Sequence, residues 1–479
     1  MSLNIGQIAS EAARFPTSAP LDQSRQSRGR EIASMIRKRA QSPARTITAE
    51  AAAGLVKSGM WLDYGAILAH PDCFDRALAA RVSELHDVKI RNTLSTGPRA
   101  VLEADPEGRH FFMMSLFFSG YDRKKSDAGR CDYIPANLGE IDDYYTRNLD
   151  PVDIVIIKTC PADRDGNFNL SAATLWHRAI IERARLVIVE TCATLPYCHG
   201  IDNSIHASEV DYIIEGGNAA VFELPKPPLT DADRAVARFI AAEIEDGSCL
   251  QIGIGGMPNA VCSLLLESGV RNLGIHTEML TDGIIDLYKA GLVTGAAKTL
   301  DPGKITFSFA LGSKYLYDAI DHNRDFSARA TRYTNLPHII MQNDRAVSIN
   351  NTTQMDLQGQ AASESDGHRH ISGTGGQLQF VRGGYASKGG KSFICMSSTY
   401  NKRAAPRSRI VFDLTLGNVV TTPRTDVMYV VTEYGIVNLK GKSVAQRAKA
   451  MISIAHPDFR EGLERQVHEH RLIPSDFTI

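Results

Sequence analysis

Short apolar runs that alternate with helical stretches constrain this chain more than any other feature. Four of these runs are VDIVIIK (152–158), ARLVIVET (184–191), RIVFDL (409–414) and VMYVVTE (427–433). Buried strands of parallel sheets have near-continuous apolar sequences of this kind, and their alternation with helices is typical of α/β proteins. The sequence therefore predicts an α/β architecture in which these four runs are strands.

The length of the chain favours two large domains, because 479 residues exceed what one ordinary core accommodates. The segment ELPKPPLTDAD (223–233) is the predicted linker, since its prolines interrupt both periodicities and Thr230 or Asp231 can cap the next helix. We expect three parts: a polar lead-in (1–45), an N-terminal α/β domain (46–225) and a C-terminal α/β domain (229–479).

A faint internal echo relates the two predicted domains. The segment from Gly59 to Gly65 resembles the segment from Gly247 to Gly253, at a constant offset of 188 residues. Chance similarity between two strand–turn–helix units is the alternative explanation. The echo favours two related open α/β domains that pack face to face, with the active site in the cleft between them.

Charge and hydropathy exclude several classes of function. The net charge of −1 gives no electrostatic footprint for nucleic acid, and no apolar run approaches the roughly 18 to 20 residues that cross a bilayer. The N-terminus lacks the pattern of a secretory signal. A mitochondrial transit peptide is the alternative for this Arg- and Ser-rich segment, but Glu11, Asp22 and Glu31 speak against it. We expect no membrane and no nucleic-acid partner.

The eight cysteines form no CxxC pair and are expected to be reduced, mostly buried thiols of a cytoplasmic protein. Cys192 and Cys198 lie near His199 and His206 in the sequence, which raises the alternative of a zinc site. Their spacing fits no standard zinc site, so structural roles are favoured and no metal ligand is predicted.

The stretch LQIGIGGMPNAVCSLLLESG (250–269) is the most informative candidate for chemistry. A strand is predicted to end at Ile252, and a helix is predicted to begin near Pro258, a residue that fits a first helical turn. The loop between them presents free N–H groups to an anion, although glycine-rich turns also occur for packing alone. The candidate binding residues are Gly253, Ile254, Gly255, Gly256 and Met257.

A carboxylate follows the next predicted strand, Leu273 to His276. Glu278 lies just past the carboxyl end of that strand, where ligands bind in open α/β sheets. A solvated loop acid or a helix cap is the alternative. The glycine loop on the preceding strand end favours a functional role for Glu278.

A second glycine cluster, HISGTGGQLQFVRGGYASKGGKS, occupies residues 370–392. Backbone N–H groups of such a turn can form an oxyanion hole or hold a phosphate. A flexible surface hairpin is the alternative interpretation.

Together these segments resemble the acetyl-CoA hydrolase/transferase family of class I CoA-transferases, and most of all the 4-hydroxybutyrate CoA-transferase type. The matching pieces occur in the family's order between residues 245 and 465: QIGIGGMPNAV (251–261), LGIHTEMLTDGIIDLYKAGLVTGAAKTLDPGKI (273–305), INNTTQMDLQGQAASES (349–365), ISGTGGQLQFVRGG (371–384), TTPRTDVMYVVTEYGIVNLKGKS (421–443) and ISIAHPDFREGL (452–463). In the first half, DRDGNFNLS (163–171) is similar to a family stretch. The segment 191–197 departs from the Asn-x-x-x-Pro-Arg pattern that many relatives carry.

The resemblance implies roles for individual residues. By it, Glu278 is the nucleophile and the loop from Gly253 to Met257 binds CoA. Ser372 and Gly376 match CoA-contacting positions, and Gly376 also matches an oxyanion donor. Lys388 matches a CoA-contacting lysine, and Glu433 matches a second active-site acid.

The implied function is transfer of coenzyme A between an acyl-CoA and a free carboxylic acid, by ping-pong kinetics through a glutamyl-CoA thioester. Coenzyme A is then a substrate, with no permanently bound cofactor. An acyl-CoA hydrolase on the same scaffold and a non-catalytic CoA-binding protein are the alternatives. Acetate, butyrate, 4-hydroxybutyrate, succinate and itaconate all stay open as acids. A homodimer or a higher homo-oligomer is expected.

Overall fold

The most apolar segments of the first half build an eight-stranded sheet. Its strand order is β1-β10-β8-β6-β2-β3-β4-β5, and the chain is represented by a computed structural model that describes residues 43–225, 228–402 and 405–473. Every pair of neighbouring strands in this sheet is parallel. The central strands β6 (Val152–Thr159) and β8 (Ala184–Thr191) are largely buried, as apolar strands covered on both faces must be.

The other elements of the first half connect and cover this sheet. The strands are β1 (Arg45–Thr46), β2 (Trp61–Ala66), β3 (Val88–Thr93), β4 (Phe111–Ser115), β5 (Cys131–Tyr133), β7 (Asn167–Asn169), β9 (Ser204–His206) and β10 (Tyr212–Glu215). The helices are α3 (Ala49–Ala53), η1 (Ile67–Ala69), α4 (Cys73–Ala79), α5 (Ala100–Ala104), α6 (Gly120–Asp127), η2 (Leu138–Glu140), α7 (Ile141–Arg147), α8 (His177–Arg183) and η3 (Ala207–Glu209).

A second eight-stranded sheet organises the rest of the chain, in the order β16-β14-β12-β11-β17-β22-β26-β27. It is parallel except at one edge, where β27 (Gly435–Asn438) pairs antiparallel with β26 (Tyr429–Thr432). Its other strands are β11 (Cys249–Ile252), β12 (Gly274–His276), β14 (Ile305–Phe307), β16 (Phe326–Ala328), β17 (Ala346–Asn351) and β22 (Lys391–Cys395).

Helices and small sheets complete the second half. The helices are α9 (Asp231–Ala241), α10 (Gly256–Ser268), α11 (Asp282–Lys289), α12 (Lys314–Ile320), α13 (Thr331–Thr334), α14 (Pro337–Ile340), α15 (Gln377–Ala386), α16 (Val444–Ser453) and α17 (Pro457–Glu469). The short strands are β13 (Met279–Leu280), β15 (Phe309–Ala310), β18 (Gln354–Asp356), β19 (Ala361–Ala362), β20 (Ser365–Asp366), β21 (Arg369–His370), β23 (Thr399–Lys402), β24 (Ala405–Ser408) and β25 (Ile410–Val411).

Three of the four apolar runs are strands of the large sheets, namely β6, β8 and β26. The run at residues 409–414 is a strand over only part of its length. Only Ile410 and Val411 form a strand there, and it belongs to a three-stranded sheet with β18 and β19. Ile410 is fully buried, so the apolar run reports burial in a separate small core and not membership of the large sheet.

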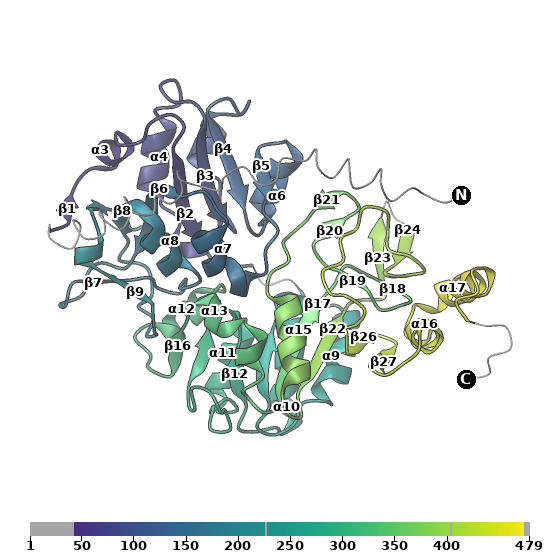
Figure 1. Ribbon diagram of the computed structural model, residues 1–479. Coiled ribbons are helices and arrows are strands. Elements are labelled where there is room, and N and C mark those ends of the chain that lie inside the picture. The colour runs from purple at the N-terminus through teal and green to yellow at the C-terminus, as the bar shows by residue number, and fades with distance from the viewer. Residues whose placement is uncertain (1–42, 226–227, 403–404, 474–479) are drawn as a thin grey trace, which may run out of the picture.

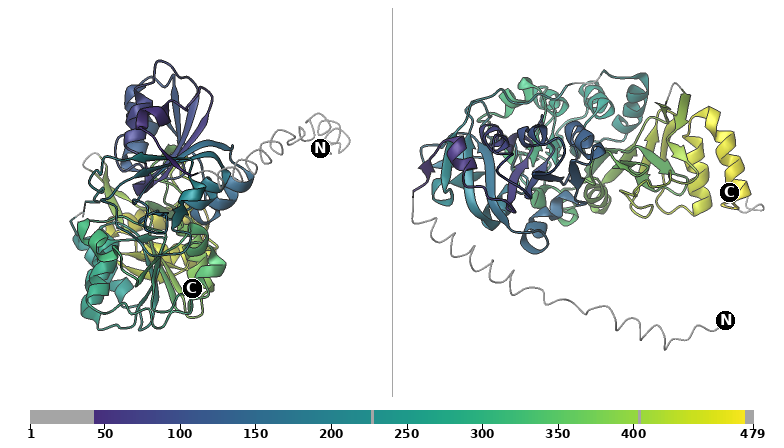
Figure 2. Two further views of the ribbon diagram at one scale, coloured as in Figure 1. Left: turned by 90° about the vertical axis from the view of Figure 1, so that its left-hand side faces the viewer. Right: turned by 90° about the horizontal axis from the view of Figure 1, so that it is seen from above.

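The two halves of the chain lie one on the other, with the purple and blue first half above the green second half in Figure 1 and in the left view of Figure 2. Backbone hydrogen bonds cross between them: the Thr174 N–H donates to the Ser308 carbonyl at 3.1 Å, and the Ala310 N–H donates to the Ala172 carbonyl at 2.9 Å. Ion pairs add to this contact, since Arg332 bonds Asp142 at 3.1 Å. A continuous interface therefore joins the two sheets.

The predicted cap at the linker is confirmed. The Thr230 side chain accepts the Asp233 N–H, and Asp233 bonds back to the Thr230 backbone, so both residues close a capping box on α9. All eight strands of the first large sheet precede β11, and all eight strands of the second come from β11 onward. We therefore propose domain boundaries as 46–225 and 229–479. Most of the predicted lead-in (1–45) lies outside the described residues. Within the described residues, no helix is long and apolar enough to cross a membrane.

Candidate active site

Glu278 lies two residues beyond the carboxyl end of β12, as the sequence predicts. Its backbone is fixed from one side, because its carbonyl accepts the Ser308 N–H at 2.9 Å and the Phe309 N–H at 3.1 Å. Ser308 also contacts the first half, because its carbonyl accepts the Thr174 N–H. The Glu278 backbone is thus bonded to a residue that contacts the first half.

The Glu278 carboxyl group lies in a poorly solvated environment. The side chain is half-buried, and the Asn335 side-chain amide donates a hydrogen bond to its Oε2. The Thr334 hydroxyl donates to Asn335 Oδ1 at 2.7 Å, which fixes the amide with its nitrogen toward Glu278. Burial raises the pKa of Glu278 to about 7, and the hydrogen bond from Asn335 offsets only part of that rise. The carboxylate is therefore more basic than a solvated one.

The predicted glycine loop follows the strand next to that of Glu278. Its strand β11 pairs parallel with β12 in the register Leu250 to Ile275, so the loop and Glu278 leave the same carboxyl edge of the sheet. Gly255 has φ +124°, a conformation that side chains rarely adopt, and it precedes the first turn of α10. The first N–H groups of α10 have no partner within a helix and therefore suit an anionic or strongly polar ligand.

The second glycine cluster also reaches Glu278. A Cβ at Gly376 would stand 2.3 Å from Glu278 Oε2 and 2.4 Å from Asn335 Nδ2, so only glycine fits there. Within the described part of the chain, the Gly376 N–H makes no hydrogen bond. The cluster is not a hairpin, the alternative that its composition allowed: it is a turn that leads into α15 and then into β22. Ser372 lies at the start of this turn, and its carbonyl accepts the Phe118 N–H of the first half at 3.2 Å.

Glu433 lies in the turn between β26 and β27, at the same carboxyl edge of the sheet as Glu278 and four strands from β12. Its carboxylate accepts the Ser398 N–H at 2.7 Å and the Ser398 hydroxyl at 2.6 Å. These bonds fasten the loop after β22 to the next strand, so Glu433 acts here as a loop anchor.

Lys388, the predicted CoA-contacting lysine, lies apart from the glycine loop within this chain. It lies just before β22, at the amino end of that strand, whereas Glu278 lies at the carboxyl edge of the same parallel sheet. Its side chain is 87% exposed, and its ammonium group lies 3.8 Å from Asp344. Within this chain, Lys388 therefore lies at the opposite edge from the glycine loop.

Sequence reasoning missed Asn335. It is 57 residues from Glu278 in the chain and follows the short helix α13, with no motif around it. His276, which the sequence placed in the strand, supports this arrangement, since its Nε2 lies 3.0 Å from the Thr334 carbonyl. No signal in the sequence indicated that the chain brings these residues together.

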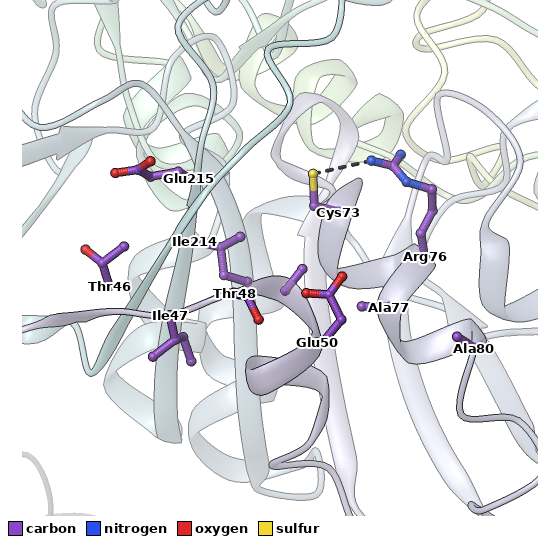
Figure 3. Close-up of a pocket in the computed structure, with 11 residues that line it drawn as sticks. Thr46, Ile47, Thr48, Glu50, Cys73, Arg76, Ala77, Ala80, Ile214 and Glu215 are labelled. Atoms are coloured by element: carbon purple, nitrogen blue, oxygen red, sulfur yellow. Dashed lines mark hydrogen bonds between the residues drawn. The ribbon is translucent and has the colours of Figure 1, made fainter.

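A separate cavity of about 690 Å³ lies at the outer edge of the first sheet, between α3, α4 and the strands β1 and β10 (Figure 3). Arg76 donates a hydrogen bond to Cys73 Sγ at 3.3 Å in this cavity, and Glu50 and Glu215 also line it. None of the predicted site residues lines it. Cavity size therefore does not locate the chemistry that Glu278 and the glycine turns suggest.

The predicted character of the cysteines is partly tested. All eight are free, and all but Cys73 are buried. Cys192 and Cys198 do not gather with histidines, because within the described residues no group of three His, Cys, Asp or Glu side chains is placed to hold a metal ion.

Comparisons with known proteins cover most of the chain. Residues 30–224 match the acetyl-CoA hydrolase/transferase N-terminal domain, and residues 312–467 match the C-terminal domain of the same family. The butyryl-CoA:acetate CoA-transferase of Anaerostipes caccae is 42% identical, over 89% of this chain and 96% of that protein. The 4-hydroxybutyrate coenzyme A transferase of Clostridium kluyveri is 40% identical, over 87% of this chain and 96% of that protein.

Solved structures agree with these matches. RipA from Yersinia pestis superposes with a TM-score of 0.81 and 34% identity, over 92% of this chain and all of that one. The 4-hydroxybutyrate CoA-transferase from Porphyromonas gingivalis superposes with a TM-score of 0.72 and 31% identity, over 89% of this chain and 98% of that one. Glu278 and the glycine loop lie between the two segments that the family domains match, but inside the span that these whole-chain comparisons cover.

Proposed function

The chain belongs to the acetyl-CoA hydrolase/transferase family, and from that premise we propose that it transfers coenzyme A between an acyl-CoA and a free carboxylic acid through a thioester on Glu278. Short-chain acids are the proposed substrates, because the relatives are named for butyrate, acetate and 4-hydroxybutyrate. The observation that carries the proposal is the contact between the half-buried Glu278 carboxyl group and the Gly376 turn, beside the glycine loop.

The first half of the reaction moves CoA onto the protein. A Glu278 carboxylate oxygen attacks the acyl-CoA carbonyl, and CoA leaves as its thiolate, which gives a mixed anhydride between the acyl group and Glu278. The thiolate then attacks the Glu278 carbonyl carbon, and the first carboxylate leaves. The product is the glutamyl-CoA thioester, with no proton, water or nucleotide consumed.

The second half returns CoA to a new acid. The incoming carboxylate attacks the thioester carbonyl of Glu278 and displaces CoA thiolate, which gives the second mixed anhydride. The thiolate attacks the acyl carbonyl of that anhydride and releases free Glu278 together with the new acyl-CoA. The first acid leaves before the second acid binds, so the kinetics are ping-pong.

Each addition step places negative charge on a carbonyl oxygen close to Glu278. The Gly376 N–H and the Asn335 amide are the proposed donors to these oxyanions, since both adjoin the Glu278 carboxyl group. One preorganised donor contributes roughly 3 kcal/mol. The raised pKa of Glu278, about 7, indicates a weakly solvated carboxylate, which is a stronger nucleophile than a hydrated one.

The loop from Gly253 to Met257 is the proposed binding site for CoA, with Ser372 at a further contact. Binding there holds the thiol against Glu278 and supplies much of the acceleration. Glu433 is proposed to act indirectly, by anchoring the loop after β22 through Ser398. Lys388 has no part in this proposal, because it lies at the opposite edge of the sheet.

Mass spectrometry after incubation with an acyl-CoA tests the proposal. Butyryl-CoA without an acceptor acid should leave CoA on the protein, at the mass of CoA less one water. Hydroxylamine should convert this adduct to a hydroxamate in the peptide that holds His276, Thr277 and Glu278, and acetate should discharge it as acetyl-CoA.

An adduct on any other residue would overturn the assignment of Glu278. A protein that forms the adduct but releases it to water as fast as to acetate would be the hydrolase alternative. We also propose a homo-oligomer, probed by light scattering; a monomer mass across micromolar concentrations would reject it.

A further inference from the structure

One tyrosine of the first half reaches into the glycine turn of the second. Tyr133 ends strand β5, and its hydroxyl accepts the Thr374 N–H at 2.9 Å and donates to Glu364 Oε2 at 3.0 Å. Its ring packs between Phe118, with centroids 5.5 Å apart, and His370, with centroids 4.8 Å apart. The hydroxyl is thus presented to the turn by a ring that aromatic neighbours hold in place.

Glu364 is an unusual partner for that hydroxyl. It is 3% exposed, and it forms no ion pair with a Lys or Arg within the described part of the chain. Its carboxyl oxygens accept instead from hydroxyl groups: Tyr133 and Thr374 at 3.0 Å each, and Thr421 at 2.8 Å. A buried carboxylate that depends on three hydroxyls fixes their positions, because the loss of one leaves charge without a donor.

The turn that these bonds hold is the one that carries Gly376. Thr374 stands two residues before Gly376, in the middle of the segment from Ser372 to Gly376. The first half also binds this segment at both ends, since the Phe118 N–H donates to the Ser372 carbonyl and the Leu138 N–H donates to the Gly375 carbonyl, each at 3.2 Å. The backbone of the turn is therefore shaped by contacts with the first half.

We propose that Tyr133 and Glu364 are positioning residues that hold the turn through Thr374, so that the Gly376 N–H meets the oxygen on which charge develops at Glu278. Neither side chain reaches the reacting atoms. Tyr133, in the first half, bonds Thr374 directly. Glu364, in the second half, accepts hydrogen bonds from both Tyr133 and Thr374. This inference rests on the proposed function, because it assigns a task only if Glu278 is the nucleophile.

The variant Tyr133→Phe tests the inference, with Tyr121→Phe as its matched control. Tyr133→Phe keeps the packed ring and removes the three hydrogen bonds of the hydroxyl, to Glu364 and to the Thr374 N–H and hydroxyl. Tyr121 also donates its hydroxyl to a glutamate, Glu103, at 2.6 Å, but on the exposed surface of the first half. The expected result for Tyr133→Phe is a fall in kcat of about 10- to 100-fold, less than the loss of an oxyanion donor outright. KM for acyl-CoA should change less than about threefold, because the loop from Gly253 to Met257, the main proposed CoA site, is untouched and the Ser372 carbonyl keeps its bond to Phe118.

Two further measurements separate positioning from general stability. Amide exchange in residues 371–377 should speed up in Tyr133→Phe and not in Tyr121→Phe. The effects of Tyr133→Phe and Glu364→Gln on kcat should be non-additive in the double variant, because both substitutions act on the same hydrogen bond between Tyr133 and Glu364. Should Tyr133→Phe fail to fold, Thr374→Val, which removes the Thr374 hydroxyl bonds to Glu364 and Tyr133, carries the same prediction of lower kcat at constant KM.

The outcomes separate a failure of the proposed CoA transfer from a failure of the positioning role. If the wild-type protein and Tyr121→Phe transfer no CoA, the proposed function fails. If both transfer CoA and Tyr133→Phe has the kcat of the wild type, the positioning role is overturned while the proposed function stands. A fall in kcat accompanied by an equal rise in KM would also overturn it, since that result indicates a disturbed binding site.

Discussion

The two large sheets share one strand order but differ in what their carboxyl edges carry. From β2 in the first sheet, the order runs through β3, β4 and β5 on one side and through β6, β8 and β10 on the other. From β11 in the second, it runs through β12, β14 and β16 on one side and through β17, β22 and β26 on the other. The echo at an offset of 188 residues aligns the start of β2 with the start of β11, so the repeat in sequence corresponds to a repeat in topology.

The difference is clearest at the strand beside the central one. Two residues after β3 stands Ser95, whose N–H and hydroxyl both donate to Asp122, at 3.0 and 2.5 Å. Two residues after β12 stands Glu278, whose side chain has a single hydrogen-bond donor in Asn335 within the described residues. At this point the first half pairs Ser95 with a carboxylate acceptor. In the second half, Glu278 is itself the carboxylate, and Asn335 is its one side-chain donor within the described residues.

The helices that lead into the corresponding strands β8 and β22 show the same contrast. Helix α8 begins after Trp176, which is 1% exposed and fills its site completely. Helix α15 begins after Gly376, which leaves room for the Glu278 carboxyl group and bares an N–H. At corresponding positions, the first half is thus filled by a tryptophan, and the second half is open beside Glu278.

The largest expected effects come from two separate variants, in which alanine replaces either Glu278 or Asp122. Glu278→Ala should lower kcat/KM at least about 1000-fold, because no other group can form the thioester, and it should still bind CoA. Its free energy of unfolding should not fall, since a poorly solvated carboxyl group is removed. Steady-state kinetics, a CoA binding titration and urea unfolding measure the three quantities.

Asp122→Ala should behave in the opposite way. It removes the acceptor for Ser95 and breaks the capping box on α6, so the free energy of unfolding should fall by about 3 kcal/mol. The folded fraction should keep its kcat. A folded Asp122→Ala protein without activity would break the division of labour between the two sheets.

The next effect concerns Gly376, which precedes α15 as Trp176 precedes α8. Gly376→Ala places a Cβ where Glu278 Oε2 and the Asn335 amide now lie, so both must shift. We expect kcat to fall about 100-fold, in the range seen when an oxyanion donor is lost. Gly462→Ala is the matched control, because a Cβ at this site in α17 meets nothing within 4 Å. Equal activity in the two variants would show that the start of α15 takes no part in catalysis.

The pH dependence follows from the raised pKa of Glu278. The nucleophile is the carboxylate, so kcat/KM should rise with pH and level off above about 7, and below it should fall about tenfold per pH unit. The hydrogen bond from Asn335 favours the charged form and lowers this pKa, so Asn335→Ala should move the whole profile to higher pH. Asn343→Ala removes another buried amide, one that accepts the Leu300 N–H and does not contact Glu278, and it should leave the midpoint unchanged. An unmoved midpoint in Asn335→Ala would assign the titration to another group.

Local patterns predicted the parts of the site that one strand and its following turn create. The glycine loop and Glu278 belong to consecutive strand–turn units, and parallel pairing aligns their ends, so spacing along the chain was enough to find them. Asn335 contacts Glu278 from 57 residues further along the chain. Tyr133 contacts the Gly376 turn from the other half of the chain. Such contacts depend on how the sheets pack, which no local pattern records. For the same reason the apolar run at 409–414 indicated a buried strand but not the sheet to which it belongs.

The smallest expected effect concerns Glu433, the acid that the sequence paired with Glu278. Its two hydrogen bonds to Ser398 tie neighbouring strand ends together, four strands from β12. Glu433→Gln keeps one acceptor and loses the other, so the free energy of unfolding should fall by about 1 kcal/mol and kcat by less than about tenfold. The thioester on Glu278 should still form, and Ser398→Ala should have a similar effect if the shared bond is the cause. Loss of the adduct in Glu433→Gln, with Ser398→Ala fully active, would instead require Glu433 to meet the substrate. The open edge of the second sheet would then extend from β12 as far as β26.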